Sequence, residues 1–368
     1  EVQSICLRNN IPFYTYRLPD TEDVVFGAQL TDDTTLFKGF EYHRGEEGFV
    51  IVPFNPSSWS FPYIIRPDLK FRNALTDPAA IVNLQNTVFN TPERKFSCQD
   101  WGHLEFVDKV RSLKNILEQE NIRTATLSRT ITIPCDSILT APSLFRQMLQ
   151  YRHAFVFFVA IPGKCAWMGA SPEPFLRYSR EGFQTTLLSG VRPSTAGGDT
   201  PAWDEQEIEE QETISNYIGE TLRPFFRRNL EKSGPATMQA GNMLHLCTHF
   251  KSDEQLSADQ IDILAKTLHP SPAVCGIPKK NTMQIIVETE AQDRKYYTGY
   301  LGPLSASGGF DLFMNLRSME IFDDALKLFV GSDITPDSDP ERKWQETNEK
   351  ANTILNLIRQ INYGKTNF

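Results

Sequence analysis

Strand-length apolar segments occur in runs along this chain, and helical patterns separate the runs. Five such segments lie between Arg123 and Leu188, with one helical pattern, Pro142–Tyr151, among them. A regular β-α-β winding would instead alternate each strand with a helix. The clustering therefore predicts an α+β fold with large, mainly antiparallel sheets.

The same periodicities predict the other elements of the chain. Strands are predicted at Arg123–Ile133, Ala154–Ile161, Cys165–Gly169, Phe175–Ser179, Gly182–Leu188, Phe310–Ser318 and Ala325–Val330. Helices are predicted at Trp101–Glu120, Pro142–Tyr151, Ala202–Arg228, Ser257–Leu268, Lys279–Ala291 and Ser338–Ile361. We expect one large domain, 1–368, in which 1–95 is the more variable part and 96–368 carries the functional residues.

Composition excludes several classes of partner. The 368 residues carry a net charge of −9, and nucleic acids or anionic membranes require clustered Lys and Arg. No run of 18 apolar residues, no Gly-x-Gly-x-x-Gly after a strand and no P-loop occurs. The six cysteines are scattered without a Cys-x-x-Cys pair, which indicates free thiols and a cytoplasmic protein.

Two predicted helices carry carboxylates suited to a metal. Glu207 and Glu210 are three residues apart and share one helix face, and Glu346 lies between Lys343 and Lys350 on another helix. Solvent-exposed acidic and salt-bridged surface helices would give the same patterns. If the two helices face each other across a cleft, Glu210 and Glu346 suit Mg²⁺, which prefers oxygen ligands.

Glu173 is a candidate general acid. Pro172 ends a predicted strand and leaves Glu173 at its end, where partial burial would raise the pKa of the carboxyl. The alternative is an ordinary polar residue in a turn.

The last third of the chain supplies candidate cations and donors. Arginine with tyrosine forms a carboxylate clamp, because the guanidinium donates two parallel hydrogen bonds. These residues are Arg294, Tyr297, Arg317 and Lys350. His245 lies in the strand-like segment Leu244–Thr248, where a histidine is more often a satisfied core residue.

The order of the short motifs resembles the chorismate-binding enzyme family, which contains isochorismate, salicylate, anthranilate and aminodeoxychorismate synthases. The resemblance covers about Asn121 to Leu357. It rests on Gly169-Ala-Ser-Pro-Glu173, Leu188-Ser-Gly-Val-Arg192, Glu210, His245-Leu-Cys-Thr248, Leu268-His-Pro-Ser-Pro-Ala273, Asp293-Arg294, Tyr297-Thr-Gly299, Arg317, Ser338-Asp-Pro340 and Trp344-Gln-Glu-Thr347. The form of the Leu268 motif is similar to the isochorismate and salicylate branch, which serves menaquinone or siderophore synthesis.

The resemblance implies a single domain with two stacked antiparallel sheets, helices outside, and a monomer or weak homodimer. It implies Mg²⁺ bound by Glu210 and Glu346, with Glu207 further out, and chorismate as the substrate. Glu173 would protonate the departing C4 hydroxyl while water attacks C2. The residues implied to bind the substrate are Tyr297, Arg317, Lys350, Gly190, Ser332 and His245.

Several site positions depart from the family pattern. Thr124 stands where water-using members carry a lysine base, and threonine can position a water but is no strong base. Asp333 replaces a glycine of the backbone cradle, and Lys343 replaces a glutamate near the metal. Three functions therefore stay open: an isochorismate synthase, another chorismate enzyme such as a salicylate-forming lyase or an aminating synthase, and a chorismate-binding protein with little catalysis.

Overall fold

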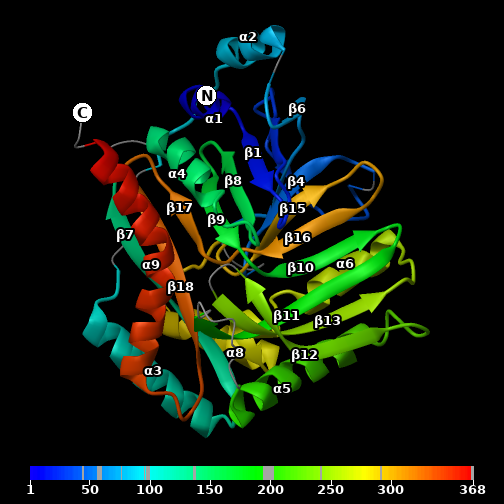
Figure 1. The fold of residues 1–368 in the computed structure, drawn as a ribbon, viewed down its shortest axis with the longest axis vertical. Helices are drawn as coiled ribbons and strands as arrows, with labels where there is room; N and C mark the ends of the chain where they lie inside the picture. Colours follow the sequence, from blue (N-terminus) through cyan, green and yellow to red (C-terminus); the bar gives the residue numbers. More distant parts are fainter. Residues whose placement is uncertain are drawn as a thin grey trace.

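The computed structural model of the chain describes residues 1–43, 45–55, 60–75, 77–94, 96, 100–135, 138–193, 203–240, 243–290 and 292–365. Its core is formed by two large sheets, in which the strand pairings are antiparallel. Figure 1 shows both sheets, with α9 lying along β18. The predicted α+β fold with two stacked sheets is confirmed.

The order of the strands in space differs from their order along the chain. Across the first sheet, neighbouring strands are β14 (Gly276–Ile277), β7 (Thr124–Pro134), β18 (Ala325–Ile334), β17 (Ser318–Ile321), β9 (Cys165–Ser171), β8 (Phe155–Ile161), β1 (Phe13–Arg17), β2 (Val24–Ala28) and β6 (Leu69–Arg72). Across the second sheet they are β12 (Glu231–Ala240), β13 (Met243–Ser252), β11 (Gly182–Pro193), β10 (Pro174–Ser179), β16 (Phe310–Met314), β15 (Tyr300–Leu304), β4 (Gly48–Val52), β5 (Tyr63–Ile65) and β3 (Thr35–Leu36).

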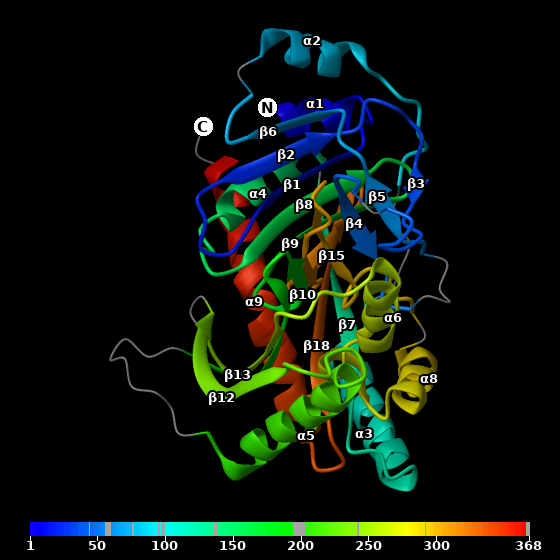
Figure 2. The ribbon, with the colours of Figure 1, turned by 90° about the vertical axis from the view of Figure 1, so that its right-hand side faces the viewer.

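Helices cover the outer faces of the sheets. They are α1 (Val2–Arg8), α2 (Pro78–Asn86), α3 (His103–Gln119), α4 (Ala141–Met148), α5 (Glu205–Leu222), α6 (Ala258–Leu268), α7 (Pro272–Cys275), α8 (Lys279–Glu290) and α9 (Pro340–Lys365). Figure 2 shows α2 at one end of the molecule and α3 and α5 at the other. No helix among the described residues is both long and apolar enough to cross a bilayer.

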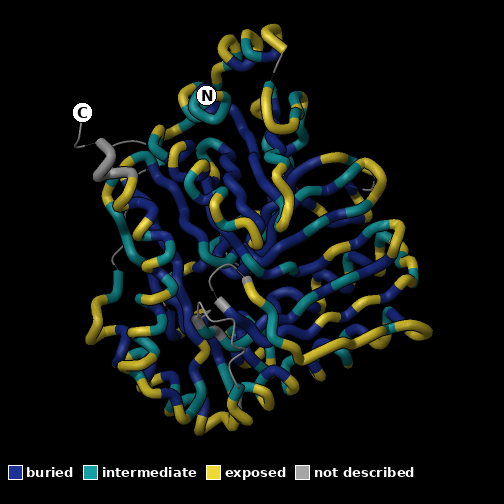
Figure 3. The backbone as a smooth tube through the Cα atoms, in the orientation of Figure 1, coloured by how far each residue is buried: buried dark blue, intermediate teal, exposed yellow. Residues whose placement is uncertain are grey.

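Strand β8 shows how the apolar pattern builds these layers. All seven of its residues are buried, and neighbouring residues point to opposite faces of the sheet. Val156 and Phe158 pack outward in one core cluster with α4 and α9, whereas Phe155 packs inward between the sheets. There its ring stacks on Phe313 of the second sheet, with 4.1 Å between ring centroids. Figure 3 shows the buried residues concentrated along the strands.

The chain crosses between the sheets at two places that lie side by side. Glu173 follows β9 of the first sheet and precedes β10 of the second, and Arg317 lies between β16 and β17. The Met314 amide donates to the Glu173 carbonyl over 3.0 Å, and the Ala170 amide donates to the Arg317 carbonyl over 3.2 Å. These bonds bring two candidate site residues together.

One predicted strand, Phe310–Ser318, is wrong as a single element, because the structure divides it between the two sheets. Asn315 turns inward and donates its Nδ2 to the Tyr296 carbonyl over 2.8 Å. Arg317 adopts a left-handed backbone with φ of 47°, which ends the ladder.

The helix predicted from Ala202 begins at Glu205, where Asp204 and Glu207 form a capping box. Ala202 itself lies outside the described residues.

The other predicted helices and strands are present with small shifts of their ends. None of the described cysteines forms a disulfide, and Cys98 lies outside the described part.

Candidate active site

Arg317 is a half-buried cation that has no counter-ion in the described part of the chain. Among the described residues its side chain has no hydrogen bond or ion pair, and burial lowers the pKa of the guanidinium. Burying an uncompensated charge is costly, so an arginine in these surroundings is suited to bind an anionic ligand. A carboxylate suits this position, because the planar guanidinium can donate two parallel hydrogen bonds to its two oxygens.

His245 lies beside this arginine, on β13 of the second sheet. Burial and the positive charge of Arg317 lower the pKa of the imidazole to about 4, so the ring is neutral at physiological pH. Its Nε2 atom is buried without a hydrogen-bond partner among the described residues. The imidazole is therefore buried, as a core histidine would be, but it is not satisfied.

Gly190 also belongs to this region, because its backbone accepts a hydrogen bond from His245. Its φ of 57° is left-handed, and a Cβ there would lie 2.8 Å from the ring of Trp203. Both the backbone conformation and the contact require glycine.

Arg294, one of the candidate cations, is already paired within the protein. Arg294 is engaged with Glu290: its Nε donates over 2.8 Å and its Nη2 over 2.6 Å, and both side chains are buried. Arg294 thus belongs to a buried ion pair that stabilises the fold. Tyr297 is buried, stacks on Phe329, and has its hydroxyl 3.2 Å from where a Cβ of Gly331 would be.

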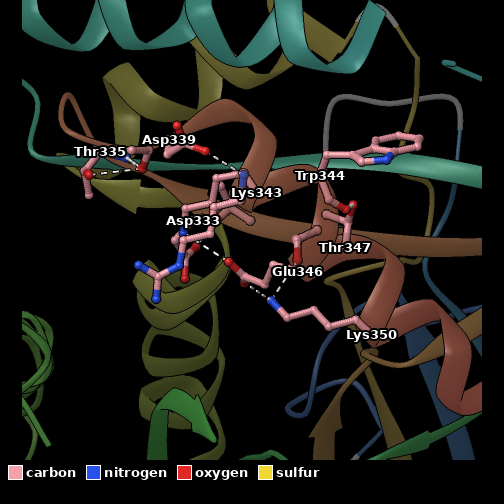
Figure 4. Close-up of polar contacts among 12 residues, drawn as sticks. Asp333, Thr335, Asp339, Lys343, Trp344, Glu346, Thr347 and Lys350 are labelled. Atoms are coloured by element: carbon pink, nitrogen blue, oxygen red, sulfur yellow. Dashed lines mark hydrogen bonds and ion pairs between the residues drawn. The ribbon is translucent and has the colours of Figure 1, made fainter. Parts of the chain in front are cut away.

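Helix α9 places a carboxylate between two ammonium groups (Figure 4). Lys343 donates to Glu346 Oε2 over 3.1 Å, and Lys350 donates to Oε1 over 2.7 Å. Burial alone would raise the pKa of Glu346, but the charges of Lys350 and Lys343 outweigh it and lower the pKa to about 2. Lys350 also donates to the Gly331 carbonyl over 2.9 Å, which ties the helix to β18.

Ser332 lies on β18 beside this carboxylate. Its hydroxyl is buried and approaches Glu346 without the geometry of a full hydrogen bond. Together with His245 Nε2, it is a buried polar atom that a bound ligand can satisfy.

The acidic side chains of α5 lie in different surroundings. Glu207 accepts hydrogen bonds from Arg192 and, over 3.1 Å, from the Asp204 amide. Its carboxylate thus caps the helix and pairs with a cation, and no spacing in the sequence indicated this arginine partner. Glu210 follows one turn later and is half-buried.

These carboxylates fit Mg²⁺ in their chemistry. No group of three or more His, Cys, Asp or Glu side chains in the described part of the chain lies close enough to hold a metal ion. Mg²⁺ in enzymes is commonly held by only one or two carboxylates and keeps several waters. The low pKa of Glu346 keeps this oxygen donor ionised, although Lys343 and Lys350 compete for it.

Glu173 has the properties of a proton donor. Its side chain is only 7% exposed. Burial, together with the negative charge of Asp333, raises the pKa of the carboxyl to about 8. The group is therefore mostly protonated at neutral pH, as the sequence predicted for a general acid.

Two threonines and Asp333 lie at the neighbouring ends of β7 and β18. Thr126 donates to Asp333 Oδ1 over 2.7 Å, and Thr124 lies two residues earlier on the same face of β7. The sequence motifs identified Thr124 and Asp333 as departures from the family pattern. They did not predict the hydrogen bond between Thr126 and Asp333.

Within the described residues, a buried acid, a cation without a counter-ion and two unsatisfied polar atoms thus make up a candidate site that suits a small anionic molecule. The chain matches the chorismate binding enzyme family over residues 70–356, and it belongs to that family. The resemblance found in the sequence is confirmed.

Relatives and solved structures agree with this placement. The chain is 27% identical over 320 residues to the vibriobactin-specific isochorismate synthase of Vibrio cholerae, covering 83% of this chain and 78% of that protein. It is 27% identical over 316 residues to the isochorismate synthase EntC of Escherichia coli, with 83% and 80% covered. The structure of MenF, the menaquinone-specific isochorismate synthase from Escherichia coli, has the same fold, with a TM-score of 0.78, 18% identity, and 97% and 90% of the chains covered.

Proposed function

We propose that this protein is an isochorismate synthase, an isomerase that converts chorismate to isochorismate. The observation that carries the proposal is Glu173, a buried carboxylic acid whose pKa is raised to about 8 by burial and by the negative charge of Asp333, at a chain crossing that lies beside the one holding Arg317. Removing the C4 hydroxyl of chorismate requires a proton, and Glu173 supplies it. The family membership and the isochorismate synthases among the relatives support the choice of substrate.

The charges of the site suit a dianion. In the proposal, Arg317 and Tyr297 bind the enolpyruvyl carboxylate, and Lys350 lies near the ring carboxylate. Gly190, Ser332 and His245 contact the substrate, because Ser332 and His245 offer buried unsatisfied atoms. These contacts fix the ring with C4 towards Glu173, and orientation of this kind contributes roughly 7–11 kcal/mol in favourable cases.

Glu210 and Glu346 would hold Mg²⁺, with Glu207 further out, and the ion would supply positive charge for the ring carboxylate. A water adds to C2 from the opposite face of the ring, where Thr124 helps to position it.

The test is to incubate the purified protein with chorismate and Mg²⁺ and to identify the products by mass spectrometry. Isochorismate is the expected product. Salicylate would replace the proposal with a lyase, and an amino product formed with ammonia would replace it with an aminating synthase. Tight binding of chorismate without turnover would make the protein a binding protein.

A further inference from the structure

The bond between Thr126 and Asp333 belongs to a continuous strand ladder. Strand β7 pairs with β18 from Pro134 opposite Ala325 to Ala125 opposite Ile334, and Thr126 lies directly opposite Asp333. The ladder therefore fixes the two Cα atoms, and the bond of 2.7 Å fixes the carboxylate. An ionised carboxylate has about four acceptor positions, so one hydroxyl leaves most of them available.

Asp333 faces the proposed site. Its negative charge contributes to the raised pKa of Glu173, and it acts in the same direction on Tyr297 and Cys275. Gly331 lies two residues earlier on the same face of β18, where Lys350 donates to its carbonyl and the Tyr297 hydroxyl lies 3.2 Å from where a Cβ would be. Asp333 thus shares a region with the acid and with substrate-binding residues.

Glu173 and Asp333 have opposite environments. Glu173 is buried, whereas Asp333 is exposed and accepts a hydrogen bond. Burial favours the neutral form of Glu173, whereas Asp333 lies at the surface in contact with water.

The water-addition step of the proposed function requires a base, and the hydroxyls of Thr124 and Thr126 are too weakly basic for this. We propose that Asp333, oriented by Thr126, is the base that accepts the proton of the water attacking C2. This inference rests on the proposed function. It assigns to Asp333 the proton transfer that Thr124 alone cannot perform.

The step balances in protons and electrons. The water loses one proton to Asp333, and its oxygen forms a bond to C2. The C1=C2 electron pair moves to C1–C6, the C5=C6 pair moves to C4–C5, and the C4–O bond breaks. The departing hydroxyl takes the proton of Glu173 and leaves as water. Asp333 ends protonated and Glu173 ionised, and exchange with solvent restores both.

Several titratable or charged groups surround Asp333 in addition to Glu173. They come from the segments packed around the ends of β7 and β18, and they are Cys275, Arg294, Tyr297, Lys343, Glu346 and Lys350. The positive charges of α9 offset the cost of placing Asp333 near a dianion.

Asp333→Asn keeps the shape of the side chain and removes its basicity. We expect kcat to fall about 10²–10⁴-fold, while KM for chorismate does not rise, because a negative charge near the substrate is lost. Adding Thr124→Lys to this variant introduces a new base on the same face of the sheet. The double variant should have a kcat at least about ten-fold above that of Asp333→Asn alone. Asp337→Asn, an exposed residue just after β18, is the matched control and should retain wild-type kcat.

Direct binding of chorismate to each variant shows whether it is folded, and Asp333→Ser replaces Asp333→Asn if that variant does not fold. A variant that binds chorismate and keeps kcat within about two-fold of wild type overturns the base assignment and leaves the proposed function intact. A wild-type protein that makes no isochorismate overturns the proposed function first.

Discussion

Glu173 and Glu346 have the same side chain, but the structure gives them opposite protonation states at neutral pH. Burial, aided by the charge of Asp333, raises the pKa of Glu173 to about 8. At Glu346 burial acts in the same direction, but Lys350 and Lys343 outweigh it and lower the pKa to about 2. One residue is therefore suited to give a proton and the other to hold a cation.

The Glu173→Gln variant tests the acid directly. Glutamine keeps the size and polarity of the neutral acid but has no proton to give to the leaving hydroxyl. We expect chorismate to bind with an unchanged Kd, measured by titration calorimetry, while kcat falls about 10²–10⁴-fold. A fully active Glu173→Gln enzyme would show that the acid lies elsewhere.

The pH dependence of the wild-type enzyme follows from the same group. Glu173 donates only while it is protonated, so its contribution is complete below its pKa of about 8 and is lost as the pH rises through that value. Initial rates with saturating chorismate should fall by about ten-fold per pH unit above pH 8. A rate that stays constant up to pH 10 is incompatible with this role.

At the level of elements, α9 shows which contacts the periodicity of the sequence can predict. The spacing predicted Lys343, Glu346 and Lys350 on one helix face, and both ion pairs are present. The alternative of a salt-bridged surface helix is correct about the ion pairs. It is wrong about exposure, because these side chains are half-buried against β18. Periodicity could not predict that Phe310–Ser318 divides between two sheets, because the inward turn of Asn315 depends on distant Tyr296.

Glu346→Ala tests the metal proposal on this helix. Removal of the carboxylate should lower activity to background and also abolish any stimulation by Mg²⁺, because an ionised oxygen ligand is lost. Rates are measured over a titration of MgCl₂. The control is Glu349→Ala, an exposed residue on the same helix, which should match wild type. Unaltered Mg²⁺ stimulation in Glu346→Ala would remove this residue from the metal site.

For the whole molecule, the packing of the two sheets brings Glu173 and Arg317 to neighbouring crossings of the chain. The motif order in the sequence predicted the fold, which the structure confirms, and a set of site residues that stays a prediction. It could not predict the bond between Thr126 and Asp333, which are 207 residues apart, because strand register is set by long-range pairing. The engagement of Arg294 by Glu290 was missed because sequence spacing does not show which cations already have a buried partner.

The contact between the sheets is open to a stability test. Phe155 is fully buried and stacks on Phe313, so Phe155→Ala leaves a cavity between the sheets. We expect the free energy of unfolding, from urea titration, to fall by about 3–5 kcal/mol. Leu104→Ala on the surface of α3 is the control, since Leu104 is 76% exposed. A loss below about 1 kcal/mol would mean that this stack does not hold the sheets together.

In the proposed reaction, water adds to C2 of chorismate while the C4 hydroxyl leaves. Turnover of chorismate by the wild-type enzyme in H₂¹⁸O, sampled early and analysed by mass spectrometry, tests this directly. The account predicts isochorismate with a single ¹⁸O atom at C2. Unlabelled isochorismate, or the absence of any isochorismate, would contradict it.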